Sequence, residues 1–123
     1  MRKALTPLGE TEMEVLHHVW ELKNASVAEV HERIRETRKV AYTTIMTVMK
    51  NLANKGYLAY DKEGLTYVYY PARKPEDVQH ALVSGLLQKV FKGSAPALIQ
   101  TLVKNEDLSD NDKREIIGLI DSM

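Results

Sequence analysis

The side chains that could hold a metal ion or act as a nucleophile are few and scattered. The chain has four histidines, His17, His18, His31 and His80, and no cysteine. Adjacent helical residues point about 100° apart, so His17 and His18 do not share a metal easily, and no histidine pair brackets a glutamate at a spacing of four. The glycines are dispersed instead of forming a phosphate loop, and no serine lies in a nucleophile-elbow pattern. We therefore expect no enzyme, no metal site and no intrinsic cofactor.

A second kind of chemistry lies in residues 42–55, where apolar residues repeat at helical spacing. The opposite face of this predicted helix is polar and mostly uncharged; it carries Thr43, Thr44, Thr47, Lys50, Asn51 and Asn54. A solvated helix face normally prefers Glu, Lys and Gln, because these residues have higher helix propensity. The threonines are therefore either tolerated on a plain surface or kept for binding.

The elements that position this face follow from the flanking sequence. Residues 10–22 form an amphipathic pattern, and a capping box at Ser26 and Glu29 begins a second helix that ends near Thr37. Gly56 is placed to end the third helix in the left-handed conformation. Two strands follow, at residues 57–60 and 65–70, joined by a turn at residues 61–64.

These elements follow the order of a winged helix–turn–helix domain: a helix, a helix–turn–helix and a β-hairpin within about seventy residues. In that fold the second helix of the pair enters the major groove of DNA, and the hairpin is a wing beside the phosphates. We predict a mainly α protein with this domain at residues 1–74.

Residues 75–123 predict three more helices, which we call the arm. The arm is too short for a robust core of its own, so its helices pack either on the first domain or on a second copy of the chain. We favour a homodimer, because helix–turn–helix readers usually bind DNA as dimers. The apolar residues assigned to this dimerisation surface are Leu82, Leu86, Val90, Phe91, Leu98, Ile99, Leu102, Ile116, Ile117 and Ile120.

The formal net charge of zero hides an uneven distribution. Residues 1–74 carry +3 and residues 75–123 carry −3, while residues 33–62 alone carry +5. The basic stretch is either an ordinary solvated surface or a footprint for nucleic acid. All six tyrosines lie between Tyr42 and Tyr70, where they indicate strands and core edges more often than base stacking. With no apolar run long enough for a membrane span and no signal peptide, we expect a soluble cytoplasmic protein without a membrane partner.

Several segments of the chain match one family in residue identity, and not only in the pattern of apolar and polar positions. They are Leu8-Gly9-Glu10-Thr11-Glu12-Met13-Glu14-Val15-Leu16, Ser26-Val27-Ala28-Glu29-Val30, Ala41-Tyr42-Thr43-Thr44-Ile45-Met46-Thr47-Val48, Leu52-Ala53-Asn54-Lys55-Gly56-Tyr57-Leu58 and Tyr67-Val68-Tyr69-Tyr70-Pro71. In them the chain resembles the penicillinase/methicillin-repressor family (BlaI/MecI type) over nearly its whole length. The resemblance implies a dimeric transcriptional repressor on a palindromic operator with TACA/TGTA-type half-sites. It also implies a helical dimerisation arm, and release from DNA when a sensor-activated protease cleaves that arm.

The resemblance also implies which residues meet DNA. Thr44 and Thr47 match threonines that face the operator, and their hydroxyl and methyl groups suit base edges and thymine methyls. Tyr42 and Thr43 stand at the helix N-terminus, where backbone N–H groups favour a phosphate. Four lysines, Lys39, Lys50, Lys55 and Lys62, are phosphate candidates that position the protein without specifying sequence.

The chain departs from the family pattern at three places. Met46 and Asn51, which we also assign to the DNA contact, stand where some relatives carry arginines in the recognition helix. The wing carries Ala59, Tyr60 and Asp61 where relatives often carry arginines. The pair Thr101-Leu102 aligns with the Asn-Phe pair at which a sensor protease cuts relatives. The absence of cysteine excludes the thiolate copper sensing of another branch. A protein-interaction adaptor with a winged-helix fold is the alternative function, and a regulator with a ligand pocket between arm and winged domain is a third.

Overall fold

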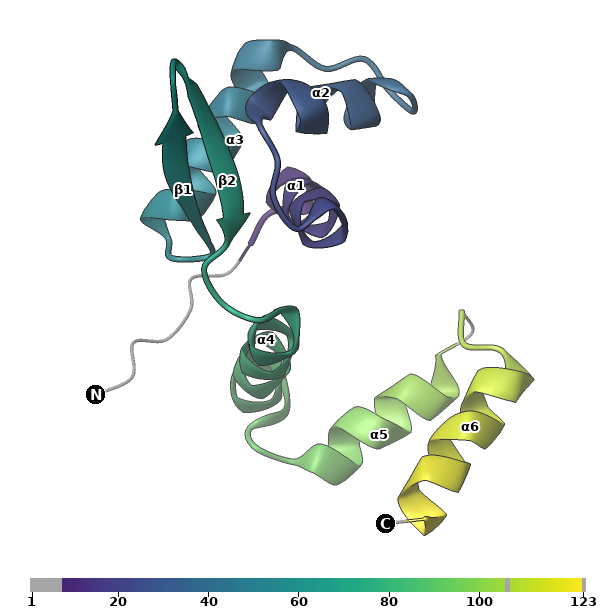
Figure 1. Cartoon of the computed structure of the whole chain (residues 1–123). Helices are drawn as coiled ribbons and strands as arrows, with labels where there is room; N and C mark the ends of the chain where they lie inside the picture. Colours follow the sequence, from purple (N-terminus) through teal and green to yellow (C-terminus); the bar gives the residue numbers. More distant parts are fainter. Residues whose placement is uncertain (1–7, 106, 123) are drawn as a thin grey trace. The chain divides into compact units, whose positions relative to one another are not determined.

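The computed structural model describes residues 8–105 and 107–122, which form two compact units divided between Leu82 and Val83 (Figure 1). The first unit contains α1 (Glu10–Leu22), α2 (Val27–Arg35), α3 (Tyr42–Asn54), β1 (Leu58–Glu63) and β2 (Thr66–Pro71). The helix α4 (Pro75–Phe91) begins in the first unit and continues into the second, which also holds α5 (Ala95–Lys104) and α6 (Asp110–Asp121).

Local capping explains where several helices begin. The Glu12 carboxylate accepts a hydrogen bond from the Gly9 N–H at 3.0 Å at the start of α1. At α2 the predicted capping box is present, with Ser26 and Glu29 exchanging hydrogen bonds of 3.0 and 3.2 Å. Ser94 and Ser109 accept from backbone N–H groups three residues ahead at the starts of α5 and α6. These bonds satisfy N–H groups that have no partner inside the helix.

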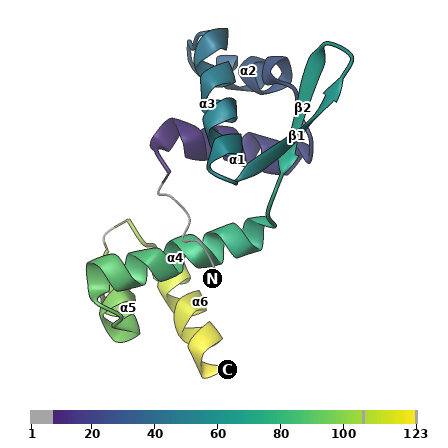
Figure 2. The same cartoon turned by 90° about the vertical axis from the view of Figure 1, so that its left-hand side faces the viewer.

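The core of the first unit lies where α1, α2 and α3 pack together beside the hairpin (Figure 2). Each helix contributes apolar residues of one face; the buried residues of these three helices are Val15, Leu16, Val19, Val27, Val30, Ile34, Ile45, Met49 and Leu52. A two-bond bridge between Ala25 and Tyr69, 2.8 Å each way, joins the α1–α2 connection to the wing. The wing is therefore fixed to the helices at its base.

The first turns of α4 also belong to this core. Val78 is fully buried and Leu82 packs against the core residues. The fold therefore divides after Leu82, eight residues beyond the position before Pro75 that the sequence predicts. Leu82, assigned from sequence to the dimerisation surface, is half-buried and packs against the core of the first unit.

The hairpin differs from its prediction at the turn. The antiparallel ladder runs from Leu58–Pro71 to Glu63–Thr66, so only Gly64 and Leu65 form the loop. The predicted turn at residues 61–64 is wrong because its polar residues pair across the strands, Asp61 with Val68 and Lys62 with Tyr67. Gly64 has a φ of +64°, which a residue with a side chain adopts less readily.

The second unit has little interior among its described residues. No residue of α5 or α6 is fully buried. Five of the predicted dimerisation residues are half-buried, namely Phe91, Leu98, Ile99, Leu102 and Ile116. Four others are exposed, namely Leu86, Val90, Ile117 and Ile120. Within the described ranges, none of the helices is long and apolar enough to cross a membrane.

Candidate nucleic-acid interface

The exposed surface of α3 is divided into two strips of different chemistry. Thr43, Thr44, Thr47 and Asn51 are exposed and make up what we call the outer face. Tyr42, Met46, Lys50 and Asn54 follow one another at intervals of four residues along the edge that faces the wing. Lys50 and Asn54, which the sequence predicts on the same face as the threonines, also line this wing-side edge. All the predicted contact residues of α3 are solvent-accessible, including Tyr42 (46% exposed) and Met46 (40% exposed).

The N-terminus of α3 is open to an anion. Its N-cap residue is Ala41, which offers no side-chain oxygen, and the first turn contains no acidic residue. The N–H groups of Tyr42 and Thr43 have no acceptor in the part of the chain that the structure describes. Such N–H groups, aligned with the helix dipole, attract a phosphate or carboxylate.

Two contacts from other helices hold this N-terminus in place. The half-buried His31 ring on α2 places Nε2 2.8 Å from the carbonyl oxygen of Val40, and its edge packs against the Tyr42 ring at a centroid distance of 5.5 Å. The Arg38 guanidinium donates to the Glu14 carboxylate on α1 at 2.6 Å. This hydrogen bond, opposed in part by burial, lowers the pKa of Glu14. The connection between α2 and α3 is thus anchored on both sides.

Lys55 has a different environment from the other predicted phosphate ligands. Its ammonium lies 2.9 and 2.8 Å from the two carboxylate oxygens of Glu12. Burial alone would raise the pKa of Glu12, but the Gly9 N–H and the Lys55 ammonium outweigh it, and the pKa is lowered. Lys55 joins the end of α3 to the start of α1, so we leave it out of the interface. By contrast, Lys39 and Lys50 have no ion pair within the described residues.

The wing presents tyrosines to α3. Because side chains alternate along a strand, one face of the hairpin carries Tyr60, Lys62, Tyr67 and Tyr69. The Tyr60 and Tyr67 rings meet edge to face at 5.1 Å, and the Lys62 ammonium lies 5.9 Å from the centre of the Tyr67 ring. Lys62 is exposed and remains a phosphate candidate. It is also close enough to Tyr67 for a cation–π contact.

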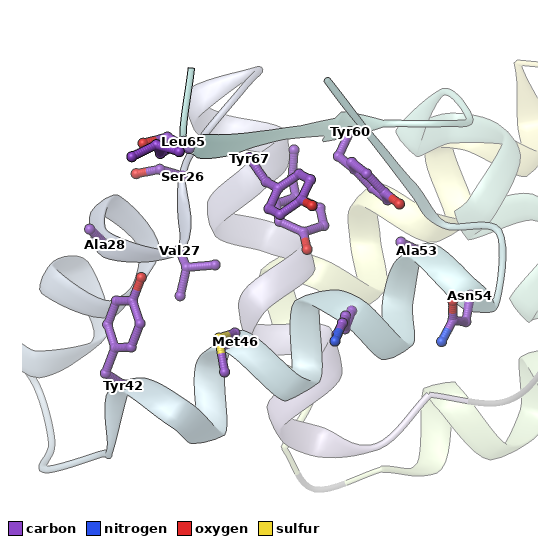
Figure 3. Close-up of a pocket in the computed structure, with 13 residues that line it drawn as sticks. Ser26, Val27, Ala28, Tyr42, Met46, Ala53, Asn54, Tyr60, Leu65 and Tyr67 are labelled. Atoms are coloured by element: carbon purple, nitrogen blue, oxygen red, sulfur yellow. The ribbon is translucent and has the colours of Figure 1, made fainter. Parts of the chain in front are cut away.

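A groove of about 610 Å³ lies between the wing, the start of α2 and the wing-side edge of α3. Figure 3 shows Tyr60 and Tyr67 pointing from the wing toward α3, with Tyr42, Met46 and Asn54 on the helix side. We call it the aromatic groove. Sequence reasoning missed it, although the cluster of tyrosines after residue 42 was the available signal. It also missed the positioning residues His31 and Arg38, since their partners are set by tertiary packing.

The chain matches a known protein family over nearly its whole length. A family model described as Penicillinase repressor matches residues 8–122. The chain belongs to the penicillinase repressor family. The methicillin resistance regulatory protein MecI of Mammaliicoccus sciuri is 27% identical over 113 residues, 92% of each chain. The transcriptional regulator BlaI of Mycobacterium tuberculosis is 32% identical over 110 residues, 88% of this chain and 80% of that one.

Solved structures agree on the fold of the first unit. The solution structure of the DNA-binding domain of the repressor BlaI has a TM-score of 0.54 and 30% identity, over 63% of this chain and 93% of that one. Monomeric Bacillus licheniformis BlaI in complex with the blaP half-operator has a TM-score of 0.52 at the same identity and the same coverage. The predicted family and the predicted mainly α winged helix–turn–helix fold are therefore confirmed. The assignment of individual contact residues stays a prediction.

Proposed function

We propose that this penicillinase repressor family member is a cytoplasmic transcriptional repressor that binds a palindromic operator as a homodimer, with α3 in the major groove. The observation that carries the proposal is the outer face of α3, exposed and made of threonines and an asparagine beside an uncapped N-terminus. Its relative BlaI, solved with a half-operator, supports the assignment.

The chemistry of the outer face suits base edges. Threonine can donate to or accept from a base through its hydroxyl and can contact a thymine methyl, while asparagine pairs with adenine through two hydrogen bonds. The free N–H groups of Tyr42 and Thr43 would take a phosphate beside the groove. Exposed Lys39, Lys50 and Lys62 would add phosphate contacts that set the position of the protein on the duplex.

The dimer is proposed from the apolar surface of the second unit. Val90 is 61% exposed and Ile117 is 52% exposed, and Leu86 and Ile120 are also exposed. A soluble monomer rarely leaves so much large aliphatic surface in contact with water over so few residues. Association of two copies through this surface would bury it and place two copies of α3 for a palindrome.

Release from DNA by a sensor pathway is the regulatory part of the proposal. Thr101 and Leu102 lie inside α5, and the Thr101 hydroxyl donates to the Ala97 carbonyl at 2.9 Å. A protease needs an extended segment, so cleavage at this pair would require local unfolding of α5. Exposure of purified protein to the candidate sensor protease, followed by mass analysis of the fragments, tests this part.

The function itself is tested by titrating the full chain onto a fluorescent palindromic fragment with TACA/TGTA half-sites and onto a shuffled fragment of equal composition. We expect tighter binding to the palindrome, and affinity that falls by roughly 10³-fold or more between 50 and 200 mM salt, as six or more phosphate contacts require. Equal binding to both fragments, or binding insensitive to salt, would contradict the proposal and favour the adaptor function.

A further inference from the structure

We propose that the aromatic groove binds a small planar aromatic anion, and that this ligand and operator DNA exclude one another. The second clause rests on the proposed function, whereas the first does not. The groove lies within one compact unit, between the wing and the wing-side edge of α3, and not at the junction of arm and winged domain.

The size and lining of the groove are those of a ligand site. Its volume of about 610 Å³ is in the range of 300–1,000 Å³ typical of small-molecule pockets, which combine apolar and aromatic walls with a few polar groups. Here the walls are Tyr60, Tyr67 and Tyr69 on the wing and Tyr42 and Met46 on α3. Tyr69 belongs to the core, but core packing does not explain Tyr60 and Tyr67, which are 51% and 45% exposed.

The arrangement of the tyrosines favours a flat aromatic ligand. Tyr60 is inclined to both neighbours, at 87° to Tyr67 and 51° to Tyr69, with centroids 5.1 and 5.5 Å away. Rings inclined in this way offer both faces and edges, and an added ring gains most by stacking on one and meeting the edge of another. Met46, on the opposite wall, can add a sulfur–aromatic contact.

The charge of the groove selects an anion. Lys50 is the one charged side chain among its described lining residues, and no carboxylate in the described part of the chain pairs with it. The other polar groups are hydroxyls and the Asn54 amide, which can donate to a carboxylate as well. A cation would meet only ring faces and neutral oxygens beside the Lys50 ammonium, so an aromatic carboxylate fits this chemistry better.

Occupancy of the groove would be coupled to DNA binding through shared residues. Tyr42, Met46 and Lys50 form one wall of the groove, and the same residues border the outer face of α3. A bound carboxylate would neutralise Lys50 and place negative charge beside a phosphate strand. Linkage then requires the ligand to weaken DNA binding by the same factor by which DNA weakens ligand binding.

The test uses three probes that share one ring system and differ in charge: 2-naphthoate, 2-naphthylmethanol and 2-naphthylmethylamine. Binding to the full chain without DNA is followed by backbone amide chemical shifts. We expect the order naphthoate, then alcohol, then amine, with the largest shifts in Tyr42, Met46, Tyr60 and Tyr67. Equal affinities, shifts elsewhere, or no binding at millimolar concentration would overturn the proposal.

Two variants and a matched control separate charge from shape. Lys50→Met should weaken naphthoate about fivefold, as expected for one accessible charge pair, and leave the alcohol unchanged. Tyr60→Ala should weaken both probes about tenfold through lost ring contacts. The exposed Lys74 lies outside the groove, so Lys74→Met should change neither. An equal effect of Lys50→Met on naphthoate and alcohol would overturn the role of charge.

Competition is measured separately, by adding saturating naphthoate to a titration of palindromic DNA. We expect a weaker apparent affinity for DNA, and no change with 2-naphthylmethylamine at the same concentration, at which it leaves the groove largely empty. If the palindrome binds and naphthoate occupies the groove without weakening DNA binding, the exclusion is wrong and the proposed function stands. If naphthoate binds the groove but no DNA binds, the proposed function fails together with the exclusion, while the ligand site remains.

Discussion

The Lys55 ammonium contacts both carboxylate oxygens of Glu12, at 2.9 and 2.8 Å, across 43 residues of sequence. The same carboxylate accepts from the Gly9 N–H. One glutamate therefore caps α1 and joins it to the C-terminal end of α3. The pair is mostly shielded from water, since the Lys55 side chain is 29% exposed and the Glu12 side chain 16% exposed. This contact holds the end of α3 against the start of α1 and uses a lysine that the sequence alone assigns to DNA.

Replacing Lys55 should therefore cost stability and leave DNA contacts intact. We expect Lys55→Met to lower the free energy of unfolding by about 1–2 kcal/mol, because a largely buried carboxylate loses its charged hydrogen-bond partner. Urea denaturation followed by circular dichroism measures this. Lys50→Met is the matched control, with a change of at most about 0.5 kcal/mol expected for an exposed lysine. A stable Lys55→Met variant whose affinity for the palindromic DNA depends less steeply on salt would contradict the structural role.

Acid should destabilise the first unit through Glu12 and Glu14. Both carboxyls have pKa values lowered from the ordinary 4.5, Glu12 by Gly9 and Lys55 against the effect of burial, and Glu14 mainly by Arg38. A lowered pKa in the folded state contributes stability above the unfolded pKa, and this stability is lost as the pH falls through the folded pKa. The midpoint of urea unfolding should therefore decrease below about pH 4.5, and less steeply in Glu12→Gln. An identical pH profile for the variant would show that Glu12 makes no such contribution.

The open N-terminus of α3 predicts opposite effects on stability and binding. Ala41 has φ −76° and ψ 143°, the extended conformation that an N-cap residue adopts. Ala41→Asp should stabilise the fold by about 0.5–1 kcal/mol through a new cap. It should also weaken DNA binding, because its carboxylate occupies the N–H groups and repels a phosphate. Ala41→Ser supplies the cap without the charge, so it should stabilise the fold and weaken DNA binding less. Equal DNA affinities of the two variants would argue against a phosphate at this N-terminus.

The exposed apolar surface of the second unit predicts that a charge placed on it prevents dimerisation. Val90→Glu places a charge where an apolar contact is proposed, so it should convert the dimer to a monomer in sedimentation at micromolar concentration. Circular dichroism should remain that of wild type, since Val90 is exposed in the single chain. Gln88→Glu, on an exposed polar position of the same helix, is the control and should remain dimeric. A monomeric wild-type protein, or a dimeric Val90→Glu, would contradict dimerisation through this surface.

Much of this fold follows from local signals. The bounds of α3 are predicted within one residue because its stripe is regular and Gly56, with a φ of +87°, ends it. Cross-strand pairing, in contrast, overrides the weak strand propensity of Asp61 and Lys62 and leaves a loop of only two residues. The partner of Lys55 and the burial of Leu82 depend on contacts between segments far apart in sequence. Local pattern identifies the outer face of α3 but not which of the predicted phosphate-binding lysines is already paired.

We propose that the threonines of the outer face read DNA sequence. The most direct measurement is the ratio of affinities for the palindromic and shuffled fragments, by fluorescence anisotropy, for wild type and for Thr44→Ala combined with Thr47→Ala. The exposed helical Thr101 lies outside the first unit, so Thr101→Ala is the matched control. We predict that the double variant loses about tenfold or more of the ratio while its affinity for shuffled DNA stays within about threefold. A double variant that keeps the wild-type ratio would contradict the account.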